Sequence, residues 1–144
     1  MRTQVCIIGA GPSGLLLSQL LHRKGIESVV LERKTKEYVL GRIRAGVLEH
    51  GFADLMREAG VGERMDREGF IHDGTVIAYG NRQFRVDFAE RANNSVIVYG
   101  QTELTRDLYE AREAADGKII YNVENVRIQD ADGDAPYVEY NVGG

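Results

Sequence analysis

The sequence predicts an α/β fold in which a parallel βαβ unit is followed by antiparallel hairpins. Three observations carry this prediction. The apolar run Val5–Ile8 leads directly into the run Gly9-Ala10-Gly11-Pro12-Ser13-Gly14, and an apolar helical stretch follows. A second apolar run, residues 28–31, ends at Glu32. Later segments alternate apolar and polar residues around glycine-containing turns, which is typical of antiparallel strands.

The glycine run fits the GxGxxG pattern of a dinucleotide-binding turn because of what lies on either side of it. Gly9 permits the tight turn, Gly11 lets the backbone approach a pyrophosphate, and Gly14 lets the helix pack closely on the strand. The start of the helix then directs N–H groups and a positive dipole end at the phosphates. The alternative is an ordinary tight turn between strand and helix, since glycine-rich turns are common.

Glu32 stands at the end of the second predicted strand, 18 residues after Gly14, close to the spacing of the acid that binds a ribose. A carboxylate there accepts hydrogen bonds from the 2′- and 3′-hydroxyls of an adenosine ribose and repels a 2′-phosphate. The predicted nucleotide in this slot is therefore FAD or NAD, and not NADP. The alternative is a solvated loop acid.

The bulk properties indicate one modest globular domain. The chain has 144 residues, of which 43% are hydrophobic and 28% charged, and its net charge is −4. An acidic chain with scattered basic residues predicts no nucleic-acid partner. Cys6, the one cysteine, is expected in the core of the first strand, so no disulfide framework is predicted. The apolar N-terminal run is too short for a membrane span, and we expect a cytoplasmic location without a membrane partner.

The remaining elements are predicted from periodicity and turn residues. Gly25 and Gly60 are placed to end helices, and Thr102 to cap one. The expected helices are residues 13–24, 48–59, 63–67 and 102–115, with a long functional loop containing one helical turn at 34–45. The expected strands are 95–99, 118–121, 124–129 and 136–142, with a turn at 130–134 and a hairpin joining 70–79 to 82–88 across Gly80-Asn81.

The last strand runs into Gly143-Gly144, a pair typical of a two-residue hairpin turn, and no returning arm follows. Because folded proteins usually cover such an edge, we expect the chain to be the front part of a longer protein. The alternative is a short natural domain with a frayed tail.

Four stretches of the chain resemble the 4-hydroxybenzoate 3-monooxygenase family of single-component, FAD-dependent aromatic hydroxylases. They are residues 4–17, 31–33, 98–103 and, the most specific, Tyr38-Val39-Leu40-Gly41-Arg42-Ile43-Arg44-Ala45-Gly46-Val47-Leu48-Glu49. The resemblance implies a Rossmann-like FAD-binding fold and the hydroxylation of a phenolic acid to a catechol with NADPH and O₂, in aromatic catabolism. It also implies a homodimeric parent enzyme.

Carried over residue by residue, the resemblance implies thirteen cofactor-binding positions. Gly9, Gly11, Ser13 and Gly14 would cradle the FAD pyrophosphate, and Glu32 would bind the adenosine ribose with Arg33 beside it. Arg42 and Arg44 would reach the phosphate and ribose groups of the flavin. Ala45, Gly46 and Val47 would line the isoalloxazine ring, and Gln101 would contact the flavin chain. Arg33 and Tyr38 match positions linked to NADPH recognition.

The chemistry of the arginines supports this role independently. Arg42 and Arg44 lie two apart in one loop and can supply planar, bidentate donors to a dianionic pyrophosphate. The alternative is a pair of solvated loop charges. His22, His50 and His72 are isolated, and the acids at 130, 132 and 134 lack the rest of a calcium loop, so we predict no metal site. We also predict no catalytic residue.

The resemblance implies that residues 1–144 are the N-terminal FAD-binding part of a larger flavoprotein monooxygenase. The second flavin motif of the family, its substrate-binding residues and most nicotinamide contacts would lie beyond residue 144, so the substrate domain is largely absent and the chain alone is expected to be inactive as a hydroxylase. Two alternatives stay open. One is a non-catalytic module that binds FAD or ADP-ribose, and the other is an NAD-dependent oxidoreductase domain.

Overall fold

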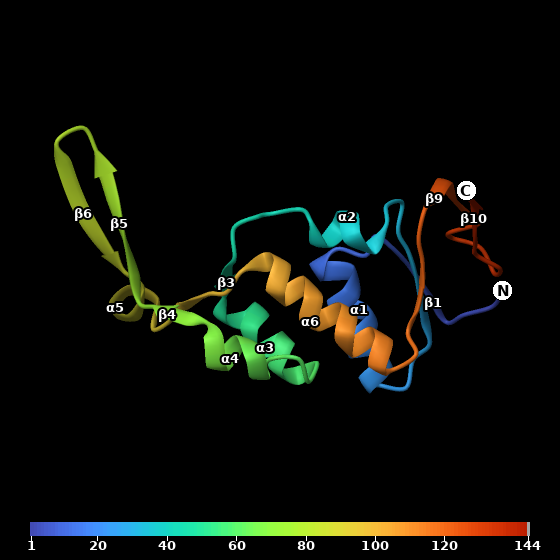
Figure 1. Ribbon diagram of the computed structural model, residues 1–144, viewed down its shortest axis with the longest axis horizontal. Helices are drawn as coiled ribbons and strands as arrows, with labels where there is room; N and C mark the ends of the chain where they lie inside the picture. Colours follow the sequence, from blue (N-terminus) through green and yellow to red (C-terminus); the bar gives the residue numbers. More distant parts are fainter. Residues whose placement is uncertain (144) are drawn as a thin grey trace. The chain divides into compact units, whose positions relative to one another are not determined.

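The computed structural model describes residues 1–143 and divides the chain into two compact units. One unit is formed by Met1–Arg42 together with the chain from Leu108 on, and the other by Ile43–Asp107. Figure 1 shows both units, which are described separately below. The turn expected at Gly143-Gly144 reaches residue 144 and so lies outside the described residues.

The first unit is built on a parallel sheet. Its strands β1 (Val5–Ile8), β2 (Ser28–Leu31) and β8 (Lys118–Ile120) are arranged in the order β1-β2-β8, and both pairings are parallel. The predicted βαβ unit is therefore confirmed, with helix α1 (Pro12–Arg23) as its crossover. The unit also contains the helical turn α2 (Lys36–Leu40), the second half of α6 (Gln101–Ala114), and a hairpin of β9 (Val123–Gln129) and β10 (Tyr137–Val142).

Helix α1 begins and ends within one residue of the range 13–24 that its sequence predicts. Pro12 occupies the first turn, where its missing N–H costs nothing, and Gly25 follows the helix with φ +72°. Leu15 and Leu16 are buried, and the hydroxyl groups of Ser18 and Ser28 lie 2.8 Å apart, which links the helix to β2. The Ser18–Ser28 contact holds the middle of α1 against the start of β2.

The β9/β10 hairpin covers β2 but leaves β1 open, which corrects the prediction for Cys6. Val29 and Leu31 of β2 form a buried cluster with Val123. The register pairs Cys6 with Val29, so their side chains share one face of the sheet, yet Cys6 is exposed. The physical reason is position, because β1 is an edge strand in the described chain and the hairpin packs over its neighbour.

The second unit is built around an antiparallel sheet with the strand order β3-β7-β4. Its strands are β3 (Val47–Glu49), β7 (Val96–Val98) and β4 (Phe70–His72). A separate hairpin of β5 (Gly74–Tyr79) and β6 (Arg82–Asp87) turns at Gly80, which has φ +55°, as expected (Figure 1). The helices are α3 (His50–Glu58), α4 (Glu63–Glu68), α5 (Phe88–Ala92) and the first half of α6.

Four predictions in this unit are wrong in detail. Leu48 does not open a helix, because it pairs with Ile97 in the sheet, and α3 starts after it. Residues 70–72 pair with β7 and do not extend the hairpin arm. Phe88 was expected at the end of a strand, but it begins helix α5, which is capped by the Asp87 carboxylate. Thr102 lies inside α6, which starts at Gln101, so Thr102 is not its cap.

Residues 1–143 contain neither a candidate membrane-spanning helix nor a cluster of side chains that could bind a metal ion. No helix in this range combines the length and apolarity needed to cross a bilayer. In the same range, no group of three or more His, Cys, Asp or Glu side chains is arranged to hold a metal ion.

Candidate functional site

The three glycines of the turn between β1 and α1 differ in their backbone conformation and in the space beside them. Gly9 has φ +110°, a conformation that side chains rarely adopt. A Cβ placed on Gly14 would lie 2.0 Å from the carbonyl oxygen of Gly9, so only glycine allows the helix to approach the strand. A Cβ on Gly11 would meet nothing within 4 Å. The turn and packing roles predicted for Gly9 and Gly14 are confirmed, and the space beside Gly11 is open.

The start of α1 is suited to an anion. Gly11 is the N-cap residue and offers no side-chain cap, and the first turn contains no acidic residue. Ser13 is exposed in that turn. The N–H groups of a first helical turn lack partners within the helix and carry partial positive charge, so the arrangement accommodates a phosphate.

Glu32 is built against this turn at the carboxyl end of β2. One carboxylate oxygen accepts a hydrogen bond from the Ala10 N–H at 2.8 Å, and the other accepts from the Lys34 N–H at 2.9 Å. The side chain is only partly buried, so each oxygen keeps a lone pair for a further donor. The acid is thereby oriented beside the turn, where two vicinal hydroxyl groups of a ribose can reach it.

The loop after Glu32 brings cations to one aromatic ring. Helix α2 is capped by Thr35, whose hydroxyl accepts from the Tyr38 N–H at 3.2 Å. The half-exposed Tyr38 ring has the Lys34 ammonium 5.3 Å and the Arg42 guanidinium 5.8 Å from its centroid. Arg42 also donates to the Tyr38 hydroxyl at 3.4 Å, and Arg33 is exposed nearby in sequence. This segment can bind a phosphorylated ligand from solvent.

The other predicted positions belong to the second unit. Arg44 and Ala45 are exposed in the loop before β3, and Val47 is 60% exposed. A Cβ on Gly46 would lie 2.0 Å from the Tyr99 carbonyl oxygen, and the Gly46 carbonyl accepts from the Tyr99 N–H at 2.7 Å. Strand pairing therefore requires glycine at position 46 whatever ligand binds. Gln101 begins α6, and its carbonyl accepts from the Thr105 hydroxyl.

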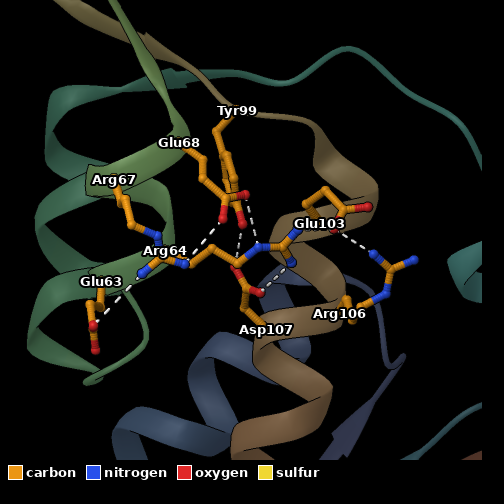
Figure 2. A network of polar contacts seen from close by, with 8 residues as sticks. All are labelled: Glu63, Arg64, Arg67, Glu68, Tyr99, Glu103, Arg106 and Asp107. Carbon is orange, nitrogen blue, oxygen red and sulfur yellow. Dashed lines mark hydrogen bonds and ion pairs between the residues drawn. The ribbon is translucent and has the colours of Figure 1, made fainter.

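A polar network beneath these residues was missed by the sequence analysis (Figure 2). The buried Tyr99 hydroxyl donates to Asp107 at 2.6 Å, and Arg64 of α4 donates to the other oxygen of Asp107 at 3.1 Å. Arg64 also pairs with Glu103 and Glu68, and Arg106 pairs with Glu103. The available signal was the four-residue spacing of Glu103 and Asp107, which places both acids on one helix face.

The surroundings of Tyr99 and Glu103 shift the pKa values of these two groups in opposite directions. Burial, followed by the hydrogen bond to Asp107, raises the pKa of Tyr99 well above its ordinary range, so the phenol remains a donor. The hydrogen bond from Arg64, followed by that from Arg106, lowers the pKa of Glu103. The network therefore joins a phenol that keeps its proton, a Glu103 carboxylate that stays ionised near neutral pH and the Arg64 guanidinium, and it links Tyr99, which follows β7, to Asp107 of α6.

The fold and the dinucleotide turn define the class of protein. Residues 2–144 match the family described as the FAD binding domain, and the chain belongs to this family. The cofactor of the domain is therefore FAD, which the open turn and the oriented Glu32 carboxylate fit.

Two named proteins are similar to the chain in sequence. The chain is 45% identical over its whole length to p-hydroxybenzoate hydroxylase of Acinetobacter baylyi, and it spans 36% of the length of that protein. Over 56% of the chain it is 46% identical to Monooxygenase 1 of Arabidopsis thaliana, of which it covers 20%. The chain thus corresponds to about a third or less of these two relatives.

Solved structures show the same fold at low sequence identity. PqsL of Pseudomonas aeruginosa in complex with 2-aminobenzoylacetate superposes with a TM-score of 0.81 at 20% identity, covering 96% of this chain and 39% of that one. The p-nitrophenol 4-monooxygenase PnpA of Pseudomonas putida gives 0.73 at 21% identity, covering 94% and 38%. The Rossmann-like α/β fold expected from the sequence is confirmed.

Proposed function

We propose that this chain is the N-terminal FAD-binding part of a flavin-dependent monooxygenase that hydroxylates 4-hydroxybenzoate-like phenolic acids to catechols with NADPH and O₂. The observation that carries the proposal is the 45% identity to p-hydroxybenzoate hydroxylase along the entire chain. The larger enzyme would supply the substrate domain, because the chain matches only 36% of that relative. The substrate, the use of NADPH and a homodimeric assembly belong to the proposal.

Within the domain we assign the binding roles that the family resemblance implies. The turn at Gly9, Gly11, Ser13 and Gly14 would hold the pyrophosphate, and Glu32 the adenosine ribose, with Arg33 beside it. When bound, the flavin supplies the redox chemistry, while the protein supplies binding and orientation. The remaining contacts are assigned to Arg42, Arg44, Ala45, Gly46, Val47 and Gln101 for the flavin half, and to Arg33 and Tyr38 for NADPH.

Two glycines of the same turn allow a matched test. Gly11→Ala adds a methyl group where nothing lies within 4 Å, so the chain should fold normally while the methyl group obstructs the approach of the pyrophosphate. Gly14→Ala places a methyl group 2.0 Å from the Gly9 oxygen, so it should destabilise the fold by about 1–3 kcal/mol, as overpacking does. The measurements are titration with FAD, followed by flavin fluorescence, and urea unfolding.

The expected result is saturable FAD binding by the unaltered chain, at least tenfold weaker binding by Gly11→Ala at nearly unchanged stability, and lower stability for Gly14→Ala. Unaltered affinity in a folded Gly11→Ala variant would refute the placement of the pyrophosphate. Steady conversion of 4-hydroxybenzoate to the catechol by these 144 residues alone would refute the need for a further substrate domain.

A non-catalytic module that binds FAD or ADP-ribose is the second candidate, because the chain corresponds to only part of the relatives it matches. Such a module would bind FAD and yet support no NADPH oxidation or hydroxylation in its full-length form. An NAD-dependent oxidoreductase is disfavoured by membership of the FAD binding domain family. Stabilisation by NAD but not by FAD would reverse that preference.

A further inference from the structure

Both backbone groups of Ala10, in the middle of the dinucleotide turn, are held by side chains from distant parts of the chain. Its N–H donates to Glu32 at 2.8 Å, and its carbonyl oxygen accepts from the Tyr109 hydroxyl at 3.2 Å. Ala10 itself is fully buried. The residue between the first two glycines of the turn is therefore fixed on both sides.

Tyr109 is a fixed donor because its surroundings immobilise the ring. It comes from the second half of α6 and is the largest fully buried side chain of the chain's described part. The Tyr121 ring centroid lies 6.4 Å from its own, and the Lys36 ammonium lies 5.4 Å from its ring centroid. Burial raises the pKa of the phenol well above its ordinary range, so the hydroxyl keeps its proton.

Fixing the Ala10 carbonyl also fixes the next N–H. No peptide bond among residues 1–143 is cis, and in a trans peptide the carbonyl and the following N–H point in opposite directions. With the Ala10 oxygen directed at Tyr109, the Gly11 N–H is directed away from it. Gly11 is also the residue with open space beside it.

We infer that Tyr109 is a positioning residue for the dinucleotide: its hydroxyl orients the Ala10–Gly11 peptide so that the Gly11 N–H is presented to the pyrophosphate. The inference rests on the proposed binding of FAD at this turn. The hydrogen bond is long for a hydroxyl donor, so its effect on affinity is modest. Glu32 sets the preceding peptide, and Tyr109 sets the one that faces the ligand.

The test compares the chain with Tyr109→Phe, which keeps the buried ring and removes only the hydroxyl. Tyr137→Phe is the control, because it makes the same change at a tyrosine of β10 that is 54% exposed. Binding is followed by NMR titration with ADP, which carries the pyrophosphate, and with adenosine, which carries only base and ribose.

Tyr109→Phe should lower the ratio of ADP affinity to adenosine affinity about threefold to fivefold, the effect of one weak buried hydrogen bond. It should also reduce the ADP-induced shift of the Gly11 amide resonance, while Tyr137→Phe changes neither. A purely structural role of Tyr109 would weaken both ligands equally. That outcome, or an unchanged ratio, would overturn the inference.

A second measurement needs neither a variant nor a ligand. In the unaltered chain the Tyr109 hydroxyl proton should exchange slowly with water and show a nuclear Overhauser effect to the Ala10–Gly11 backbone. A rapidly exchanging proton would overturn the inference by itself. Failure of the unaltered chain to bind ADP would count instead against the proposed function, so the two failures are distinguishable.

Discussion

Tyr99→Phe removes a single oxygen atom from the network of Figure 2 and leaves the ring in place. Tyr99 is 4% exposed, and its hydroxyl donates to Asp107, which is 9% exposed, at 2.6 Å. Because phenylalanine fills the same space, the variant opens no cavity around the ring. The change isolates one buried hydrogen bond to a carboxylate.

The magnitude follows from what Asp107 keeps. A hydrogen bond to a charged group contributes about 1.5–3 kcal/mol to stability. Asp107 retains its 3.1 Å contact with Arg64, so its charge stays paired after the substitution. We therefore expect the lower end, a loss of about 1.5–2 kcal/mol in the free energy of unfolding.

Urea unfolding followed by circular dichroism measures the loss. With an m-value of about 2 kcal/mol/M, the midpoint should fall by about 0.7–1 M without a change in m. Tyr79→Phe is the control, since Tyr79 is 86% exposed, and it should cost less than about 0.5 kcal/mol. A Tyr99→Phe variant as stable as the control would show that the network does not depend on the hydroxyl.

Three further predictions concern other parts of the chain. Gly46→Ala should lower the free energy of unfolding by about 1–3 kcal/mol in urea titrations, because its methyl group would lie 2.0 Å from the Tyr99 carbonyl oxygen. Gly51→Ala is the control and should cost less than about 1 kcal/mol, because its methyl group would meet no atom within 4 Å. Cys6 is exposed, so its thiol should react with a disulfide reagent in the folded chain, and a thiol that reacts only in denaturant would contradict the exposed edge strand. Partial burial raises the pKa of this thiol, so the reaction rate should keep increasing with pH above 9.0. The pKa values of Tyr99 and Tyr109 are raised, so above the ordinary phenol value of 10.0 the unfolded chain binds fewer protons than the folded one, and the free energy of unfolding should fall as the pH rises. This fall should be less steep in Tyr109→Phe, and an equal slope in both chains would contradict the assigned burial.

Secondary structure was predicted correctly where the local pattern of residues fits only one kind of element. The strand, turn, helix and second strand at residues 5–31 and the β5/β6 hairpin are determined by neighbours in sequence, and both were predicted. Leu48 was misplaced because its spacing from Phe52 also fits a helix, and only pairing with Ile97, far along the chain, decides for a strand. Cys6 was misplaced because periodicity does not tell an edge strand from a central one.

The candidate site shows the same division. The positions of Gly9, Gly14 and Glu32 follow from a motif with fixed spacing, whereas Tyr109 acts on Ala10 across 99 residues and carries no local signal. Gly46 illustrates the opposite error, since a small residue attributed to ligand approach is also required by the Tyr99 carbonyl. A glycine in a cofactor motif therefore supports a binding role only where the space beside it is open, as it is at Gly11 and is not at Gly14 or Gly46. For this reason Gly11, of the three, is the position where a substitution separates binding from folding.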